Sequence, residues 1–184
     1  MYIYLSRNIK ISVITLVTLI IFSLTYTTLD TFFMLSASVL HELGHIISAK
    51  MCKAKITSVT VGIGGADIKM NGITSYRDDA VISSGGIVFN IFFFVLFPHH
   101  PFGIYNLIYA ILNGLPICTL DGGRTLHSLL MMRFSEKCEV LCNIISCTAL
   151  FVLWQFSVYL LFKTGANVSL FLFCVCIFSS LPDR

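Results

Sequence analysis

The chain alternates between long apolar stretches and short polar ones, and this pattern predicts most of its organisation. Six stretches are long and apolar enough to form helices that cross a bilayer. They cover residues 11–29, 31–49, 80–97, 102–120, 140–162 and 164–181. The pattern therefore predicts an α-helical polytopic membrane protein with about six transmembrane helices.

The one sizeable polar segment, Lys50 to Asp79, lies between the second and third apolar stretches. Within it Val59, Val61 and Ile63 alternate with smaller or polar residues, and Asn71-Gly72 is typical of a hairpin turn. The pattern favours short β-strands in a small hairpin-like insertion on the cytoplasmic side. A mobile basic loop explains the same segment equally well.

Composition agrees with a membrane protein. Hydrophobic residues make up 57% of the 184-residue chain and charged residues only 11%, far below the roughly 25% of a soluble domain. The length predicts a single membrane-embedded domain over residues 1–184. A net charge of +3 gives no sign of nucleic-acid binding, so the lipid bilayer is the expected surrounding.

The distribution of basic residues predicts the topology. With six spans, all of the 12 Lys and Arg residues except Lys163 fall on one side of the membrane. By the positive-inside rule both termini are then cytoplasmic. The second and fourth spans run from the outside inwards, which places their polar ends toward the cytoplasm.

The second apolar stretch contains the sequence His41-Glu42-Leu43-Gly44-His45. In a helix, positions i and i+4 differ by only about 40° around the axis, so both imidazoles leave one face and can bind one zinc ion. Glu42, beside the first histidine, can then reach a metal-bound water as a catalytic base. Two polar core histidines beside a stray acid are the alternative, but ionisable groups are costly at membrane depth.

A third ligand is expected from the end of the fourth stretch. Gly114 and Pro116 should break that helix, and Asp121 follows the break. Irregular backbone is tolerated at this depth only where protein or a watery cavity surrounds it. Counting residues from the outer surface places His41 about 15 Å deep and Asp121 about 28 Å deep, so tilt or unwinding near Pro116 must bring them together.

Other polar or sulfur-bearing groups give weaker signals. Asn90, in the third stretch, needs a partner at membrane depth, and helix packing explains it as well as substrate contact does. The seven cysteines are odd in number and lie mostly in apolar runs, so no disulfide framework is expected. Cys118, three residues before Asp121, is the nearest candidate for a fourth ligand that would close a purely structural site.

Three motifs follow one another along the chain: His41-Glu42-Leu43-Gly44-His45, then Gly86-x-x-x-Asn90, and then Asn113-x-x-Pro116 followed by Leu120-Asp121-Gly122-Gly123-Arg124. Taken in this order, they resemble the site-2 protease family of intramembrane zinc metalloproteases. The resemblance covers residues 36–124, and it implies a three-helix catalytic core at about 31–124 with extra helices at 11–29, 140–162 and 164–181.

The resemblance also implies roles for individual residues. His41, His45 and Asp121 would bind one Zn²⁺ per chain, Glu42 would be the catalytic base, and a second group would contact the substrate. That second group consists of Asn90, Asn113 and Pro116. Ile87 stands where this family usually has proline, and Cys118 and Thr119 replace prolines that often follow Pro116, so loop shape and substrate fit are the features that depart from the family pattern.

Six spans and a cytoplasm-facing site are most similar to the branch that contains the sporulation factor processing protease. The C-terminal sensing domain of that branch is not expected within 184 residues, and neither is a PDZ module. The resemblance implies a membrane-protein substrate with a transmembrane or membrane-associated segment, and it leaves room for a regulatory membrane partner.

The predicted reaction is zinc-assisted hydrolysis of a peptide bond. Three protein ligands leave one position for water, whose pKa zinc lowers to about 7, and Glu42 takes its proton. A helical substrate must unwind to expose its carbonyl groups, and strands in the polar segment could hold it extended. A membrane metal carrier or a catalytically idle zinc-stabilised binding protein is the alternative, although neither needs Glu42.

Overall fold

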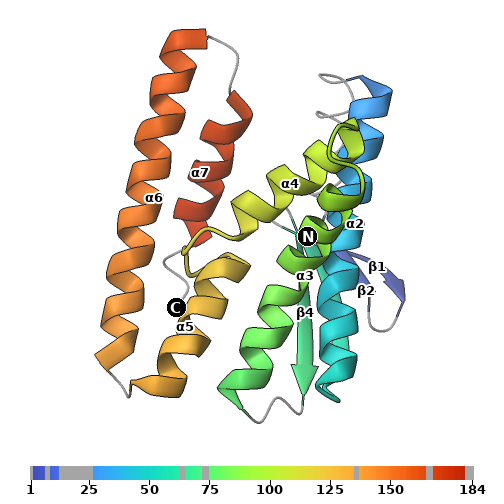
Figure 1. Ribbon diagram of the computed structural model, residues 1–184, viewed down its shortest axis with the longest axis vertical. Coiled ribbons are helices and arrows are strands. Elements are labelled where there is room, and N and C mark those ends of the chain that lie inside the picture. The colour runs from blue at the N-terminus through green and yellow to red at the C-terminus, as the bar shows by residue number, and fades with distance from the viewer. Residues whose placement is uncertain are drawn as a thin grey trace. The chain divides into compact units, whose positions relative to one another are not determined.

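The computed structural model describes residues 2–6, 9–12, 27–62, 65–71, 75–134, 137–164 and 168–180. The chain divides into two compact units, Met1–Asn113 and Gly114–Arg184, and each is described by itself. Helices and strands carry the labels of Figure 1.

Three helices of the first unit pack against one another: α2 (Thr28–Met51), α3 (Tyr76–Leu96) and α4 (Pro101–Asn113) (Figure 1). Short polar side chains fix where the first two begin. The hydroxyl of Thr27 accepts the backbone N–H of Asp30, and that of Ser75 accepts the N–H of Asp78, each at 3.2 Å. Both helices thereby gain an N-cap together with acidic residues in the first turn.

Helix α2 ends in a tight reversal at Lys53, which has a positive φ of 57°. The N–H of Ala54 reaches back to the carbonyl of Ala49 at 2.9 Å, as in a Schellman motif. A non-glycine residue in this conformation costs about 1–2 kcal/mol. The reversal leads the chain directly into the first strand of the polar segment.

The sheet of the first unit has four strands in the order β1-β2-β3-β4. They are β1 (Tyr2–Ser6), β2 (Ile9–Ser12), β3 (Lys55–Gly62) and β4 (Gly65–Asn71). The β1–β2 and β3–β4 pairs are antiparallel, with Val59 opposite Ile68, and the β2–β3 pair is parallel, with Ile9 opposite Val59. Sequence analysis did not predict β1 or β2, because residues 1–10 read as the approach to an apolar span and residues 11–12 as its beginning.

The second unit contains α5 (Asp121–Arg133), α6 (Lys137–Thr164) and α7 (Val168–Ser180), and α6 and α7 run side by side (Figure 1). Its buried core consists of Ile117, Leu120, Leu150 and Ile177. Helix α5 was not predicted, because its sequence is too polar to register among stretches chosen for membrane length and apolarity.

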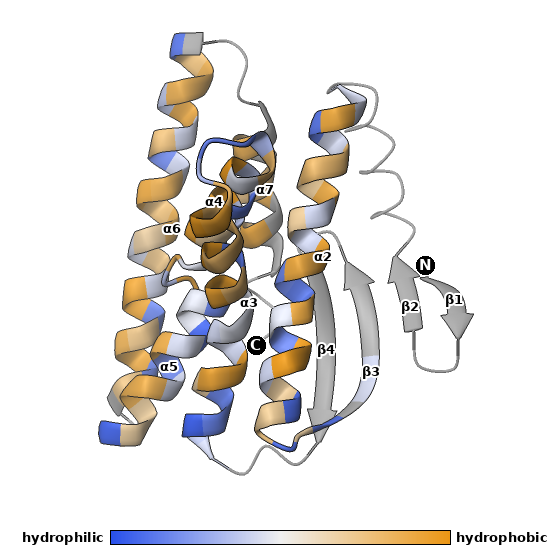
Figure 2. Cartoon of the chain, turned by 45° about the vertical axis from the view of Figure 1, so that its right-hand side comes forward, coloured by the Kyte–Doolittle hydropathy of each residue, from blue (hydrophilic) through white to orange (hydrophobic). Residues whose placement is uncertain are grey.

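Among the residues that the structure describes, three helices are long and apolar enough to cross a membrane: Thr28–Met51, Tyr76–Leu96 and Cys138–Lys163. Figure 2 shows hydrophobic residues along most of α6 and over much of α2. The chain is therefore a mostly helical protein of membrane character, as predicted. The first predicted span, residues 11–29, lies mostly outside the described residues, although residues 11–12 belong to β2 and α2 already begins at Thr28.

The fourth and sixth predicted spans differ from the structure. The helix expected over 102–120 ends at Asn113, and α5 begins only at Asp121, so the predicted break near Gly114 and Pro116 is confirmed. A rise of about 1.5 Å per residue does not apply to the irregular residues between them, so the helical count of depth does not extend to Asp121. In the sixth span the described helix is α7, with 13 residues.

Candidate metal centre

The two histidines lie one turn apart on the buried face of α2. His41 and His45 expose only 4% and 8% of their surface, and Ala37, Gly44 and Ala49 are buried on the same helix. Spacing at i and i+4 places both rings on the side that packs against α3. The sequence prediction of one shared face is confirmed.

A hydrogen bond at Nδ1 determines the tautomer of His45. Its Nδ1 lies 2.8 Å from the backbone carbonyl oxygen of Ile82, on α3. A carbonyl can only accept, so Nδ1 carries a proton, and in the neutral form of the ring Nε2 is then the unprotonated nitrogen.

The side-chain amide of Asn90 determines the tautomer of His41 in the same way. The Asn90 oxygen lies 2.6 Å from His41 Nδ1, while its Nδ2 donates to the backbone carbonyl of Ala37 at 3.0 Å and to the side-chain oxygen of Asn106 at 2.7 Å. Because Nδ2 faces two acceptors, the amide oxygen must face His41, and Nδ1 of His41 must be the donor. Both histidines therefore share one tautomer.

The resulting geometry calls for a cation. The two Nε2 atoms lie 3.1 Å apart, and in these tautomers each presents a lone pair. Two nitrogens bound at about 2.0–2.1 Å to one tetrahedral zinc ion would be about 3.3 Å apart. The pair is therefore shaped like two ligands of one metal ion, with each ring held from behind by a hydrogen bond, as is usual for metal-binding histidines.

Glycine residues of α3 make room for this arrangement. A Cβ on Gly86 would lie 2.5 Å from His45 Nε2 and 2.7 Å from His41 Cε1. On α2, a Cβ on Gly44 would lie 2.5 Å from the carbonyl oxygen of Gly85 on α3. These small residues therefore let α2 and α3 approach and leave space over the two rings.

Glu42 leaves α2 about 100° around the axis from His41 and is half-buried. Its carboxylate lies within electrostatic range of the Tyr109 hydroxyl, which hydrogen-bonds the side chain of Ser38. The Tyr109 ring itself lies 6.3 Å from the ring of His41, between centroids. The first unit thus gathers a carboxylate and a phenol beside the histidine pair.

In the second unit, Asp121 is the first residue of α5 and is half-buried. The chain before it is held firmly: Ile117 and Leu120 are buried in the core, and the N–H of Cys118 donates to the Ser146 hydroxyl at 2.7 Å. The Cys118 thiol points toward α6, with its Sγ 3.6 Å from the Asn143 side-chain oxygen. These contacts fix the position of Asp121 within the second unit. They also hold Cys118 against α6 of the same unit.

The residues expected to contact substrate have separate environments. Asn90 is fully buried beside His41, and Asn113 ends α4, where its side chain donates to the carbonyl of Tyr109 at 3.2 Å. Pro116 is half-buried in the irregular segment before α5.

Sequence reasoning passed over Asn106 and Tyr109. An asparagine in an apolar helix was a usable signal for Asn106, as it was for Asn90. No sequence pattern connects Tyr109 with Glu42.

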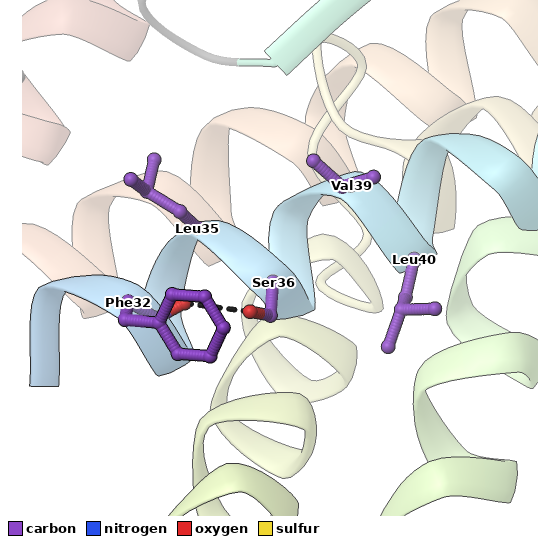
Figure 3. Close-up of a pocket in the computed structure, with 5 residues that line it drawn as sticks. All are labelled: Phe32, Leu35, Ser36, Val39 and Leu40. Carbon is purple, nitrogen blue, oxygen red and sulfur yellow. Dashed lines mark hydrogen bonds between the residues drawn. The ribbon is translucent and has the colours of Figure 1, made fainter. Parts of the chain in front are cut away.

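An open pocket lies on another face of α2, away from the histidines. Phe32, Leu35, Ser36, Val39 and Leu40 line it, and Figure 3 shows the Ser36 hydroxyl turned back to the Phe32 carbonyl, at 2.7 Å. Because Val39 and Phe32 project about 160–180° from His41 around the helix, this apolar pocket is separate from the candidate metal centre.

Comparison with known proteins identified a similar fold. The chain resembles the solved structure of a site-2 protease from Methanocaldococcus jannaschii, with a TM-score of 0.63, over 97% of this chain and 91% of that one. Sequence identity between the two is 20%, so the likeness concerns the fold. No family model and no curated protein matches the sequence.

Proposed function

We propose that this protein is an intramembrane zinc metalloprotease that hydrolyses a peptide bond in or near a transmembrane segment of a membrane-protein substrate. The observation that carries the proposal is the buried histidine pair, whose two Nε2 atoms lie 3.1 Å apart, with Glu42 on the same helix. Similarity of fold to a solved site-2 protease supports the same reaction.

Zinc is the metal that suits this set of residues. His41, His45 and Asp121 each offer one ligand atom, and two imidazoles with one carboxylate are the ligands of many catalytic zinc sites. When bound, zinc would act as a Lewis acid and lower the pKa of water to about 7. Three protein ligands leave a coordination position open, which distinguishes a catalytic site from a structural one.

Glu42 is the proposed general base. It would accept a proton from the attacking water and return it to the nitrogen of the leaving amine, so that no net proton is consumed at the carboxylate. Asn113 and Pro116 would border the substrate beside the break between α4 and α5. The Asn90 amide already has partners within the protein, so its expected contribution to substrate binding is indirect.

The proposal includes a topology and a place in the family. Both termini and the open side of the site would face the cytoplasm, with six spans, as in the branch that contains the sporulation factor processing protease. Water would reach Glu42 from that side.

The deciding experiment compares Glu42→Gln with wild type in purified protein, using zinc content and cleavage of single-span membrane peptides. We expect Glu42→Gln to keep one zinc per chain and to lose at least 100-fold in cleavage rate, the usual contribution of a general base. His41→Gln and Asp121→Asn should instead lose zinc. Equal cleavage by wild type and Glu42→Gln would contradict the assigned base.

A membrane metal carrier is the second candidate, because the same ligands could pass a metal ion across the bilayer. Zinc flux into reconstituted vesicles distinguishes the two. A carrier would move zinc at the same rate with Glu42 or Gln at position 42, whereas the protease should move none.

A further inference from the structure

We propose that Asn90 and Asn106 form an amide relay that holds His41 in its metal-binding tautomer, and that Asn106 is a positioning residue of the metal centre. The inference rests on the proposed zinc site but concerns residues behind it. Three helices supply the relay: His41 comes from α2, Asn90 from α3 and Asn106 from α4.

The relay begins at a backbone carbonyl whose role is fixed. Asn106 Nδ2 donates to the Phe102 carbonyl at 2.8 Å, so the Asn106 side-chain oxygen faces the other way and accepts from Asn90 Nδ2 at 2.7 Å. A second fixed acceptor, the carbonyl of Ala37, takes the other hydrogen of Asn90 Nδ2 at 3.0 Å. The orientation of the Asn90 amide is thus set by two backbone carbonyls rather than by the histidine.

Rotation of the Asn90 amide by 180° would be opposed at two of its three contacts. Its oxygen would then face the Ala37 carbonyl and the Asn106 oxygen, which are both acceptors. Its NH₂ group would donate to Nδ1 of His41, moving the ring proton to Nε2 and blocking the metal-binding nitrogen. Asn106 opposes this rotation directly, although it does not touch His41.

Both asparagines of the relay are buried, so each of their hydrogen bonds needs a partner within the protein. Asn90 and Asn106 are both 0% exposed, and buried polar groups left without partners are costly. Water is therefore poorly placed to replace a missing partner. His45 needs no such relay, since the Ile82 carbonyl fixes its tautomer directly.

The first measurement is made on zinc-free wild type labelled with ¹⁵N-histidine, with the His41 signals assigned by their loss in His41→Gln. The expected ring has its proton on Nδ1. A folded wild type with the proton of His41 on Nε2 would overturn the proposal, whatever its proteolytic activity.

The second measurement compares variants by chelator competition for zinc. Asn106→Leu should lower zinc affinity about 10- to 100-fold, as for other partners behind metal-binding histidines, and should shift His41 toward the Nε2–H form. Asn106→Asp should recover most of the affinity, because a neutral, buried Asp donates through its O–H to Phe102 and accepts through its other oxygen from Asn90.

Ser157→Ala is the control for loss of a buried hydrogen bond, because the Ser157 hydroxyl is fully buried in α6 and donates to the Trp154 carbonyl at 3.0 Å. It should leave zinc affinity and the His41 tautomer unchanged. Folded Asn106→Leu protein with wild-type zinc affinity, or folded Asn106→Asp protein as weak as Asn106→Leu, would refute the relay. Because both readouts are independent of cleavage, failure of the protease proposal would be seen separately in the Glu42→Gln comparison.

Discussion

The histidine pair can bind a metal only if Nε2 of each ring is unprotonated. His41 and His45 present Nε2 because Asn90 and the Ile82 carbonyl each take a hydrogen bond from Nδ1. The His-Glu-x-x-His spacing places the rings on one face, but it says nothing of their tautomers. The chemistry of the motif thus depends on α3 as much as on α2.

Gly86 provides a direct test at this scale. A methyl group at Gly86 would come within 2.5–2.8 Å of both imidazoles, so we expect Gly86→Ala to displace a ring and lower zinc affinity at least 10-fold. Chelator competition measures the loss.

Ser84→Ala is the matched control, since Ser84 lies two residues away on α3 and its hydroxyl donates within the same helix, to the Val81 carbonyl at 3.2 Å. Unchanged zinc affinity in Gly86→Ala would show that the rings do not occupy the space above this glycine.

At the scale of elements, strand β4 is at the edge of the four-stranded sheet, next to β3. An edge strand offers unpaired backbone groups to an extended peptide, which is how many proteins bind unfolded segments. We propose that β4 holds the unwound part of the substrate. The expectation of a substrate clamp in the polar segment thereby becomes specific to one strand.

Proline substitutions at Asp67 and Ile68 test this clamp. Neighbouring N–H groups along a strand point to opposite edges, so one of these prolines removes a donor to β3 and the other removes a donor from the open edge. We expect one variant to lose stability, and the other to keep stability and zinc while KM for the membrane peptide rises several-fold.

Thermal unfolding and steady-state kinetics separate the two effects. Full cleavage by both folded variants, or by protein lacking Val59 to Met70 that still binds zinc, would exclude the clamp.

At the scale of the whole molecule, three helices in the described part of the chain have the length and apolarity to cross a bilayer. Their surfaces carry exposed large apolar side chains, such as Val39 at 60%, Val95 at 66% and Val152 at 61%. In water such surfaces would aggregate, whereas in lipid they need no covering. The orientation of the helices in the membrane is then predicted from the distribution of Lys and Arg residues by the positive-inside rule.

The predicted orientation places Lys163 outside and both termini inside. Fusion of a reporter that is active only in the cytoplasm to Arg184 should give a strong signal, and fusion after Lys163 should give none. Moving positive charge to the 163 side, with Tyr159→Lys and Phe162→Lys together, should weaken the preference. Signal from the Lys163 fusion equal to that from Arg184 would contradict six spans.

The sequence by itself determined the membrane character of the chain, the helices over residues 31–49, 80–97 and 140–162, and the histidine pair with its neighbouring acid. Each of these follows from local periodicity or composition, which act over a few turns of one helix. The break before Asp121 was equally local, because Gly114 and Pro116 disfavour a continuous helix.

Only the tertiary structure decided what lies behind the histidine pair. Asn90 and Asn106 are 16 residues apart and meet His41 only when three helices pack, and glycine contacts between α2 and α3 let them approach. Strand β2 likewise pairs with β3, far along the chain, and β1 then pairs with β2. Such contacts depend on partners distant in sequence, whose positions no local pattern specifies.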